Sequence, residues 1–111
     1  EPLNVNDAYR SLKSKKIEYN LNTDTIADGL RTNLGDINFP IILDYIELII
    51  CVNEDEIISA MKLIYDKLNI LIEPSSAVAF AGLLKEKEKF KEKKVGVILS
   101  GGNVDSKKLP F

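Results

Sequence analysis

A serine at the end of a fully apolar run is the first residue here whose position suggests chemistry. Ser100 follows the apolar residues 95–99 and precedes Gly101 and Gly102. Ligands of open α/β sheets gather at the carboxyl ends of the strands, where a hydroxyl can form a hydrogen bond with them. The glycines would let the backbone approach a ring or phosphate closely, or adopt a positive φ. An ordinary strand-to-loop turn explains the same residues equally well.

Two further motifs combine an acid with a backbone feature. Glu73 follows a short apolar run and precedes Pro-Ser-Ser, which is typical of a helix start. The free N–H groups and the dipole of a helix N-terminus favour an anion nearby, but a simple helix-start acid is the favoured interpretation of the local sequence. Asp28-Gly29 is typical of a turn. Neither motif by itself specifies a ligand.

The carboxylates of Glu1 and Asp7 form a third candidate site. Together with an intervening backbone carbonyl they could hold a hard cation through oxygen ligands. Two acids six residues apart also fit an exposed helix start with no ligand. The sequence contains no histidine, which excludes histidine-based catalytic triads and histidine-ligated zinc.

Strands and helices must position these residues. The apolar runs 48–52 and 95–99 predict two buried strands, and 70–72 is a shorter run. Helices are predicted over residues 4–16, 39–46, 54–68 and 75–89. This order predicts an α/β fold with a partly parallel sheet.

The helix predicted over residues 54–68 has the clearest start. Asn53 can cap it, and Glu56 three residues later completes a capping box. Apolar residues then recur with helical spacing along one face. For the helix over residues 75–89, Ser75 or Ser76 is the predicted cap, and its second half is charged. Asn4 or Asn6 is the predicted cap of the first helix.

The composition indicates a globular domain and argues against nucleic-acid-binding and membrane-spanning proteins. The net charge is −2, with 45% hydrophobic and 29% charged residues, which is ordinary for a globular domain. The lysines alternate with glutamates, so no nucleic-acid partner is expected. No apolar run approaches the ~20 residues of a membrane span.

The single cysteine, Cys51, predicts a buried, unreactive thiol and a cytoplasmic, reducing location.

Six motifs, each weakly specific alone, occur in the same order and at similar spacing as in one family. The chain is similar to the C-terminal third of serine racemase and the serine/threonine dehydratases, which are pyridoxal-phosphate enzymes of fold type II. The resemblance implies that residues 1–111 are the C-terminal portion of the large cofactor-binding domain. The motifs, in chain order, are Glu1-Pro2-x-Asn4-x-x-Asp7, Thr25-Ile26-Ala27-Asp28-Gly29, Pro40-Ile41-Ile42, Glu54-Asp55-Glu56-Ile57, Ile72-Glu73-Pro74 and Leu99-Ser100-Gly101-Gly102-Asn103-Val104-Asp105.

The resemblance implies roles around the cofactor and the substrate. Ser100 matches the serine that meets the pyridine nitrogen, and Gly29 matches the glycine whose backbone lies beside the ring. Gly101 gives room next to Ser100, and Glu73 matches a carboxylate near the cofactor. Thr32 occupies the place of a small hydroxyl residue near the substrate carboxylate.

Further roles concern ions and nucleotides. Glu1, the Val5 carbonyl and Asp7 match a divalent cation site for magnesium, manganese or calcium. Asn103 matches an asparagine at a nucleotide site between the subunits of a homodimer. Asn69 stands where animal racemases carry a lysine near that nucleotide, which puts activation by ATP in doubt.

The implied reaction removes the Cα proton of serine or threonine. Reprotonation on the other face gives the D-amino acid, whereas loss of the β-hydroxyl gives a 2-oxo acid and ammonia. A serine at the pyridine nitrogen keeps the ring largely neutral, which makes it a milder electron sink. The lysine that forms the Schiff base is expected upstream, so no catalytic residue is assigned here and the chain alone is expected to be inactive.

Two alternatives remain open. A non-catalytic ligand-binding or regulatory domain would keep the same sheet without the chemistry. A small α/β domain with no ligand would have the same order of helices and strands but no binding site. The start at Glu-Pro and the presence of only two strands predict that this chain is part of something larger.

Overall fold

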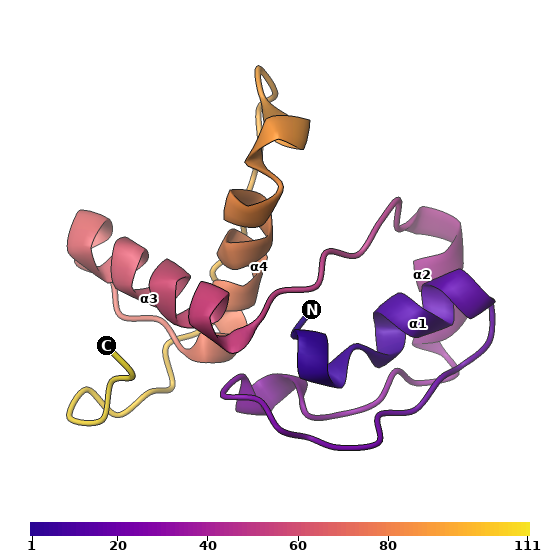
Figure 1. Cartoon of the computed structure of the whole chain (residues 1–111). Helices are drawn as coiled ribbons and strands as arrows, with labels where there is room; N and C mark the ends of the chain where they lie inside the picture. The colour runs from indigo at the N-terminus through magenta and orange to yellow at the C-terminus, as the bar shows by residue number, and fades with distance from the viewer.

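The computed structural model describes residues 1–111 and contains four α-helices in two halves. α1 and α2 lie together on one side, α3 and α4 on the other, and an extended segment connects the halves (Figure 1). The molecule measures 39 × 35 × 20 Å, so it is flat and open. The helices are α1 (Asp7–Ser14), α2 (Asn38–Tyr45), α3 (Glu54–Leu68) and α4 (Pro74–Lys85), with 3-10 turns η1 (Leu3–Val5), η2 (Asp28–Leu30) and η3 (Lys87–Phe90).

α3 confirms the prediction made from its capping residues. The Asn53 side chain accepts a hydrogen bond from the Glu56 N–H at 2.8 Å, and the Glu56 carboxylate accepts one from the Asn53 N–H at 2.7 Å. Ile57, Met61 and Ile64 are buried on one face. The helix ends at Leu68 because Asn69 adopts a left-handed conformation.

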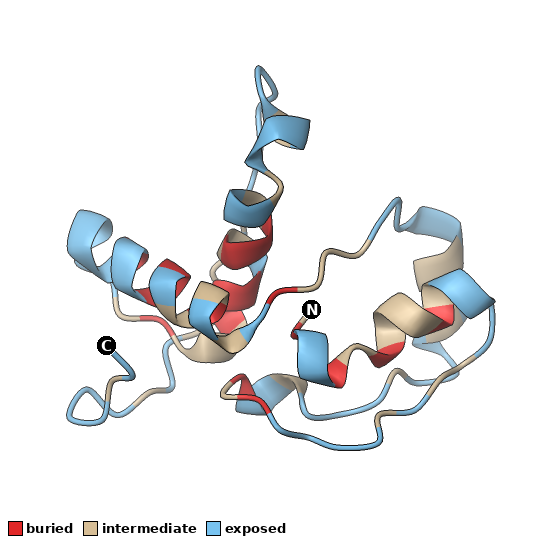
Figure 2. Ribbon diagram, viewed as in Figure 1, coloured by how far each residue is buried: buried red, intermediate tan, exposed pale blue.

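α4 packs across α3, and the main core lies at their crossing. Small residues on α4 allow the two helices to approach closely. Figure 2 shows the buried residues on the facing sides of these helices, while their outer sides are exposed. The core residues are Ala27, Val52, Ile57, Ala60, Met61, Ile64, Ile72, Ala77, Val78 and Ala81.

The ends of α4 differ from the prediction. Pro74 is its first residue and Glu73 its N-cap, with no side-chain capping bond, so neither Ser75 nor Ser76 caps it. Proline is favoured at a first helical position because its missing N–H would have no partner there. The helix stops at Lys85 rather than at residue 89, and the charged stretch forms η3 instead.

The first predicted helix is divided in two. Asn6 has φ −106° and ψ 38°, which separates η1 from α1. Neither Asn4 nor Asn6 makes a capping bond. Glu1 performs this function instead, because its carboxylate accepts the N–H groups of Ala8 at 3.1 Å and Tyr9 at 2.8 Å. α2 lies within one residue of its predicted bounds and has no buried residue.

The predicted parallel sheet does not form within these residues. Pro2 and Val52 make a single parallel bridge, in which Val52 N–H donates to the Glu1 carbonyl at 2.9 Å and Leu3 N–H to the Val52 carbonyl at 2.7 Å. Residues 95–99 form no strand and no backbone hydrogen bond, and Ile98 is 81% exposed. The predicted buried strand over residues 48–52 does not form either, because only Val52 pairs with a neighbouring backbone, at residues 1–3, and Leu48 is 44% exposed. An apolar pattern indicates extended backbone, but a strand also needs a neighbouring backbone with which to pair.

The lack of a membrane span and the burial of the single cysteine are the last features that the sequence predicts. No helix is both long enough and apolar enough to cross a membrane. Cys51 is half-buried rather than fully buried, and burial raises the pKa of its thiol. A thiol with a raised pKa forms less thiolate, as expected for an unreactive cysteine.

Candidate functional site

The N-terminus of α4 brings together three of the predicted motifs. Residues 73–76, here called the α4 first turn, contact both the turn at Gly29 and the loop that follows Ser100. Proline at the first helical position fixes where the helix begins, and the extended residues before it lie beside Gly101 and Gly102. The α4 first turn therefore places the two glycine-containing segments relative to each other.

The Asp28-Gly29 turn is confirmed as part of η2. The Gly29 N–H donates to Asp28 Oδ1 at 2.9 Å and to Ser75 Oγ at 3.0 Å. A Cβ atom on Gly29 would lie 2.9 Å from Ser75 Oγ. The φ of Gly29 is not positive. Glycine is therefore favoured here by the approach of α4, and the backbone conformation does not demand it.

The loop after Ser100 is held by Glu73. The Glu73 N–H donates to the Gly101 carbonyl at 3.1 Å, and Glu73 Oε2 accepts the Asn103 N–H at 3.2 Å. A Cβ on Gly101 would lie 2.8 Å from Glu73 Oε1, and a Cβ on Gly102 would lie 2.7 Å from the Leu71 carbonyl oxygen.

The expectation of a positive φ at Gly101 or Gly102 is wrong, because no glycine of the chain has one. Close approach to residues 71–73 explains both glycines instead. Ser100 is exposed, and its hydroxyl forms no hydrogen bond with any other residue of the chain. This hydroxyl is therefore free to bind a ligand.

Glu1 is half-buried beside the start of α1. Burial raises the pKa of its carboxyl above the ordinary value of 4.5, the N–H groups of Tyr9 and Ala8 oppose the rise, and the negative charge of Asp7 adds to it. A carboxylate in this position is stabilised by any positive charge that arrives nearby.

Asp7 is 3% exposed, so the interpretation as an exposed helix-start acid is wrong for this residue. Its Oδ1 accepts a hydrogen bond from Asn20 Nδ2 at 2.7 Å, and its Oδ2 accepts the Leu34 N–H at 2.6 Å. Val5, which supplies the third predicted ligand through its carbonyl, is also buried. The contacts to Asn20 and Leu34 could not be predicted from the sequence, because both residues come from loops without a distinctive pattern.

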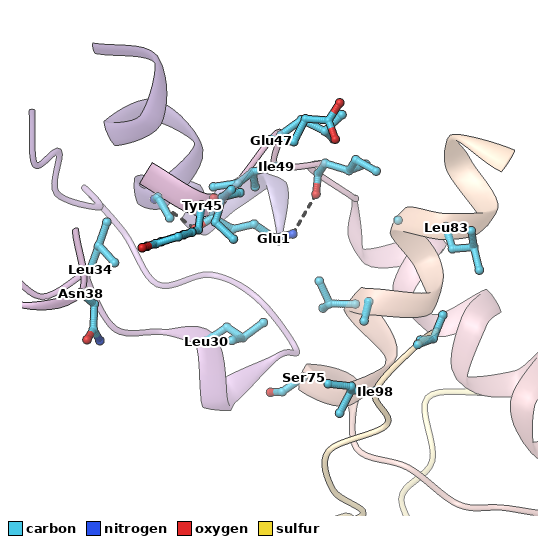
Figure 3. A pocket seen from close by; sticks show the side chains of 18 of the residues that line it. Glu1, Leu30, Leu34, Asn38, Tyr45, Glu47, Ile49, Ser75, Leu83 and Ile98 are labelled. Atoms are coloured by element: carbon cyan, nitrogen blue, oxygen red, sulfur yellow. Dashed lines mark hydrogen bonds between the residues drawn. The ribbon is translucent and has the colours of Figure 1, made fainter. Parts of the chain in front are cut away.

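An open cleft of about 1000 Å³ separates the two halves of the molecule. Figure 3 shows Glu1 and Ser75 facing it from opposite halves, and Leu30 and Ile98 also line it. Thr32 and Asp7 also line the cleft, whereas Gly29, Glu73, Ser100 and Asn103 lie outside its lining. The remaining lining is mostly apolar.

Sequence reasoning missed Ser75 and Ser76 as parts of the site. It assigned them only as helix caps, yet Ser75 Oγ accepts from Gly29, and Ser76 Oγ accepts from Gly101 at the long distance of 3.5 Å. Ser76 is 2% exposed. A serine in a first helical turn indicates a cap in any sequence, so only the fold reveals the partners of these two hydroxyls.

Comparison with known proteins shows extensive similarity. The serine racemase of Dictyostelium discoideum is 50% identical over 109 residues, covering 95% of this chain and 34% of that protein. The beta-hydroxyaspartate dehydratase of Paracoccus denitrificans is 45% identical over 111 residues, covering 100% of this chain and 35% of that protein. The solved structure of maize serine racemase has a TM-score of 0.90 at 38% identity, covering 96% of this chain and 34% of that chain.

The chain thus spans about a third of the length of these relatives, 34% and 35% of the two curated proteins. Residues 1–101 match the family model described as pyridoxal-phosphate dependent enzyme. That match includes Ser100 and every other predicted site residue except Asn103. The chain therefore belongs to the pyridoxal-phosphate dependent enzymes.

Proposed function

We propose that this chain is the C-terminal portion of the large domain of an enzyme that removes the Cα proton of a hydroxyl-bearing amino acid. The products are the D-amino acid after reprotonation, or a 2-oxo acid and ammonia after loss of water. The observation that carries the proposal is the free, exposed hydroxyl of Ser100, held next to a loop that Glu73 fixes. The names of the similar proteins support the reaction class.

The residues present fit the pyridine end of pyridoxal phosphate. Ser100 offers a neutral hydroxyl, which can donate to a ring nitrogen without holding a proton on it. Gly29 has no side chain and its backbone packs against Ser75 of the α4 first turn, so the backbone of η2 would lie close to a ring bound beside it. When bound, the cofactor supplies the electron sink that makes the Cα proton acidic.

This chain's own residues have supporting roles in that reaction. Ser100 would orient the ring and Gly29 and Gly101 would lie beside it, while Glu73 holds the loop at Gly101 and Asn103 in place. Thr32, which is exposed in the cleft, binds the substrate carboxylate through its hydroxyl. The lysine that carries the cofactor belongs to the part of the enzyme beyond this chain.

The substrate has two candidate classes. Serine or threonine is supported by the likeness to serine racemases. A 3-hydroxyaspartate substrate is supported by the 45% identity to a beta-hydroxyaspartate dehydratase along the whole chain. The two classes differ in a second carboxylate, which only 3-hydroxyaspartate carries.

A divalent cation, a nucleotide and a second subunit complete the proposal. The buried carboxylate of Asp7, the carboxylate of Glu1 and the Val5 carbonyl would hold the cation. Asn103 is exposed and would contact ATP at the boundary of a homodimer, although Asn69 lacks the positive charge that would assist binding. The single cysteine supports a cytoplasmic location.

The test uses the complete enzyme that carries this chain, loaded with pyridoxal phosphate. L-Serine, L-threonine and 3-hydroxyaspartate are supplied separately, and D-amino acid, 2-oxo acid and ammonia are measured. We expect turnover of at least one substrate. Cofactor uptake without turnover of any of the three would contradict the reaction, and failure to take up the cofactor would support a non-catalytic domain.

A further inference from the structure

The hydroxyl of Ser75 links α4 to the turn that contains Gly29. Ser75 Oγ accepts the Gly29 N–H at 3.0 Å across 46 positions of the chain. The other acceptor of this N–H is the side chain of Asp28, within the turn itself. The bond to Ser75 is therefore the hydrogen bond that ties this N–H to α4.

The Ser75 hydroxyl is not used for capping its own helix. Ser75 is the second residue of α4, whose N-cap is Glu73, and the helix has no side-chain capping bond. Serine at such a position has no advantage in helix propensity over alanine. The local structure of α4 therefore does not explain the hydroxyl, whereas the contact with Gly29 does.

Steric contact reinforces the hydrogen bond. A Cβ on Gly29 would lie 2.9 Å from Ser75 Oγ and 3.3 Å from Ser75 Cβ, and no other atom outside the turn itself lies within 4 Å. Ser75 is thus the neighbour that limits residue 29 to glycine. The Ser75 side chain therefore determines both how closely the Gly29 turn packs against α4 and which side chain can occupy position 29.

We propose that Ser75 is a positioning residue, whose hydroxyl holds the Gly29 backbone where it meets the cofactor ring. The inference rests on the proposed function, since it needs a cofactor beside Gly29. Ser75 faces the cleft and is only partly exposed, so a bound ring would shield this hydrogen bond from water. Shielded hydrogen bonds are stronger than those open to solvent.

A double-mutant cycle on the apo form of the complete enzyme tests the contact. Gly29→Ala, Ser75→Ala and the double variant are compared by their urea unfolding midpoints. We expect Gly29→Ala to lower the midpoint less in the Ser75→Ala background, because the oxygen that its Cβ would meet is gone. Additive effects of the two substitutions would overturn the inference.

Cofactor binding tests the positioning role. We expect Ser75→Ala to weaken pyridoxal phosphate binding about tenfold in a fluorescence titration, the effect of losing one hydrogen bond, and to shift the absorbance of the bound cofactor. Ser75→Thr, which keeps the hydroxyl, should restore both. Ser59→Ala is the matched control, because Ser59 is exposed on α3 away from the site.

The outcomes separate this inference from the proposed function. A wild-type enzyme that takes up no cofactor contradicts the proposed function, while the double-mutant cycle still decides whether Ser75 contacts Gly29. A wild-type enzyme that binds the cofactor, with unchanged affinity and spectrum in Ser75→Ala, overturns the inference alone. If Ser75→Ala does not fold, Ser75→Cys replaces it, because a thiol of similar size accepts hydrogen bonds only weakly.

Discussion

At the candidate site, a Cβ atom on Gly29, Gly101 or Gly102 would meet another atom at 2.9, 2.8 or 2.7 Å, respectively. At Gly101 that atom is at the end of the flexible Glu73 side chain, which can move, and at Gly29 it is the hydroxyl oxygen of the short Ser75 side chain. At Gly102 it is the Leu71 carbonyl oxygen, which is part of the backbone. Substitution of Gly102 by alanine is therefore expected to disturb the loop after Ser100 more than substitution of the other two.

Ser100 carries the first prediction at the residue scale. Ser100→Ala removes the donor to the ring nitrogen, and Ser100→Asp offers a carboxylate that would keep that nitrogen protonated. Ser100→Ala should lose about tenfold or more of the activity of the complete enzyme, as expected when a polar group loses its partner. Ser100→Asp should also lose activity, because a protonated ring is a stronger electron sink than the largely neutral one that a serine leaves. Both should also alter the absorbance of the bound cofactor. Wild-type rates and spectra in both variants would remove Ser100 from the site.

The carboxylates of Glu1 and Asp7 carry the second prediction. Calcium or magnesium should raise the Tm of the complete enzyme, since a ligand at about 100 times its Kd stabilises the folded state by about 2.7 kcal/mol. Asp7→Asn should abolish this gain, because it removes one negative charge from a buried position. Asp44→Asn, on the exposed side of α2, is the matched control. An equal gain in Asp7→Asn would show that the cation binds elsewhere.

At the scale of elements, α3 and α4 are joined by an ion pair at their crossing. Lys85 Nζ on α4 lies 3.0 Å from Glu56 Oε2 on α3 and donates to the Cys51 carbonyl at 2.9 Å. Glu56 also accepts the Asn53 N–H in the capping box. One carboxylate thus stabilises the start of α3 and its contact with α4.

Glu56 leads to a prediction about acid. Burial alone would raise the pKa of its carboxyl, but the Asn53 N–H and Lys85 outweigh it and lower the pKa below the ordinary value of 4.5. A lowered folded-state pKa contributes stability that is present above that value and lost as the pH falls through the folded-state pKa. Glu56→Gln, which can still complete the capping box, removes this contribution.

The measurement is the urea unfolding midpoint of the complete enzyme at neutral and acid pH. Glu56→Gln should be less stable than wild type at neutral pH, and the difference should shrink in acid. Asp55→Asn, an exposed acid in the same helical turn, is the control and should retain the wild-type pH dependence. A difference between Glu56→Gln and wild type that stays constant with pH would disprove the electrostatic explanation.

At the scale of the whole molecule, the open shape leaves large apolar side chains uncovered. Leu21 is 100% exposed, Tyr45 and Ile98 are each 81% exposed, and Ile37 is 80% exposed. Exposed apolar surface on this scale marks places where other protein packs. The chain also spans only 34% of the length of its Dictyostelium relative.

The isolated chain, residues 1–111, should therefore bind an apolar dye strongly and self-associate when produced alone. It should not turn over any amino acid, because the lysine that carries the cofactor is proposed to lie outside residues 1–111. Dye fluorescence and sedimentation velocity measure the first effect, with Tyr45→Ser/Ile98→Ser as a variant expected to reduce both signals. A monomeric chain that binds neither dye nor a second copy would contradict this prediction.

The sequence by itself determined those elements whose stabilising contacts lie within a few residues of each other. α3 forms where Asn53 and Glu56 predicted it, because a capping box and an apolar face act over a few residues. The turn at Asp28-Gly29 and the approximate bounds of α2 were also predictable. The family was recognisable from six motifs in register, and the comparisons confirm it.

Only the tertiary structure decided which groups meet across the chain. Glu1 caps α1, Ser75 accepts from Gly29, and Asp7 is buried against distant loops. The apolar residues 95–99 form no strand, because strand pairing depends on a neighbouring backbone and not on the pattern of one segment. Contacts between residues far apart in sequence leave no local pattern, and the positions of the site residues depend on such contacts.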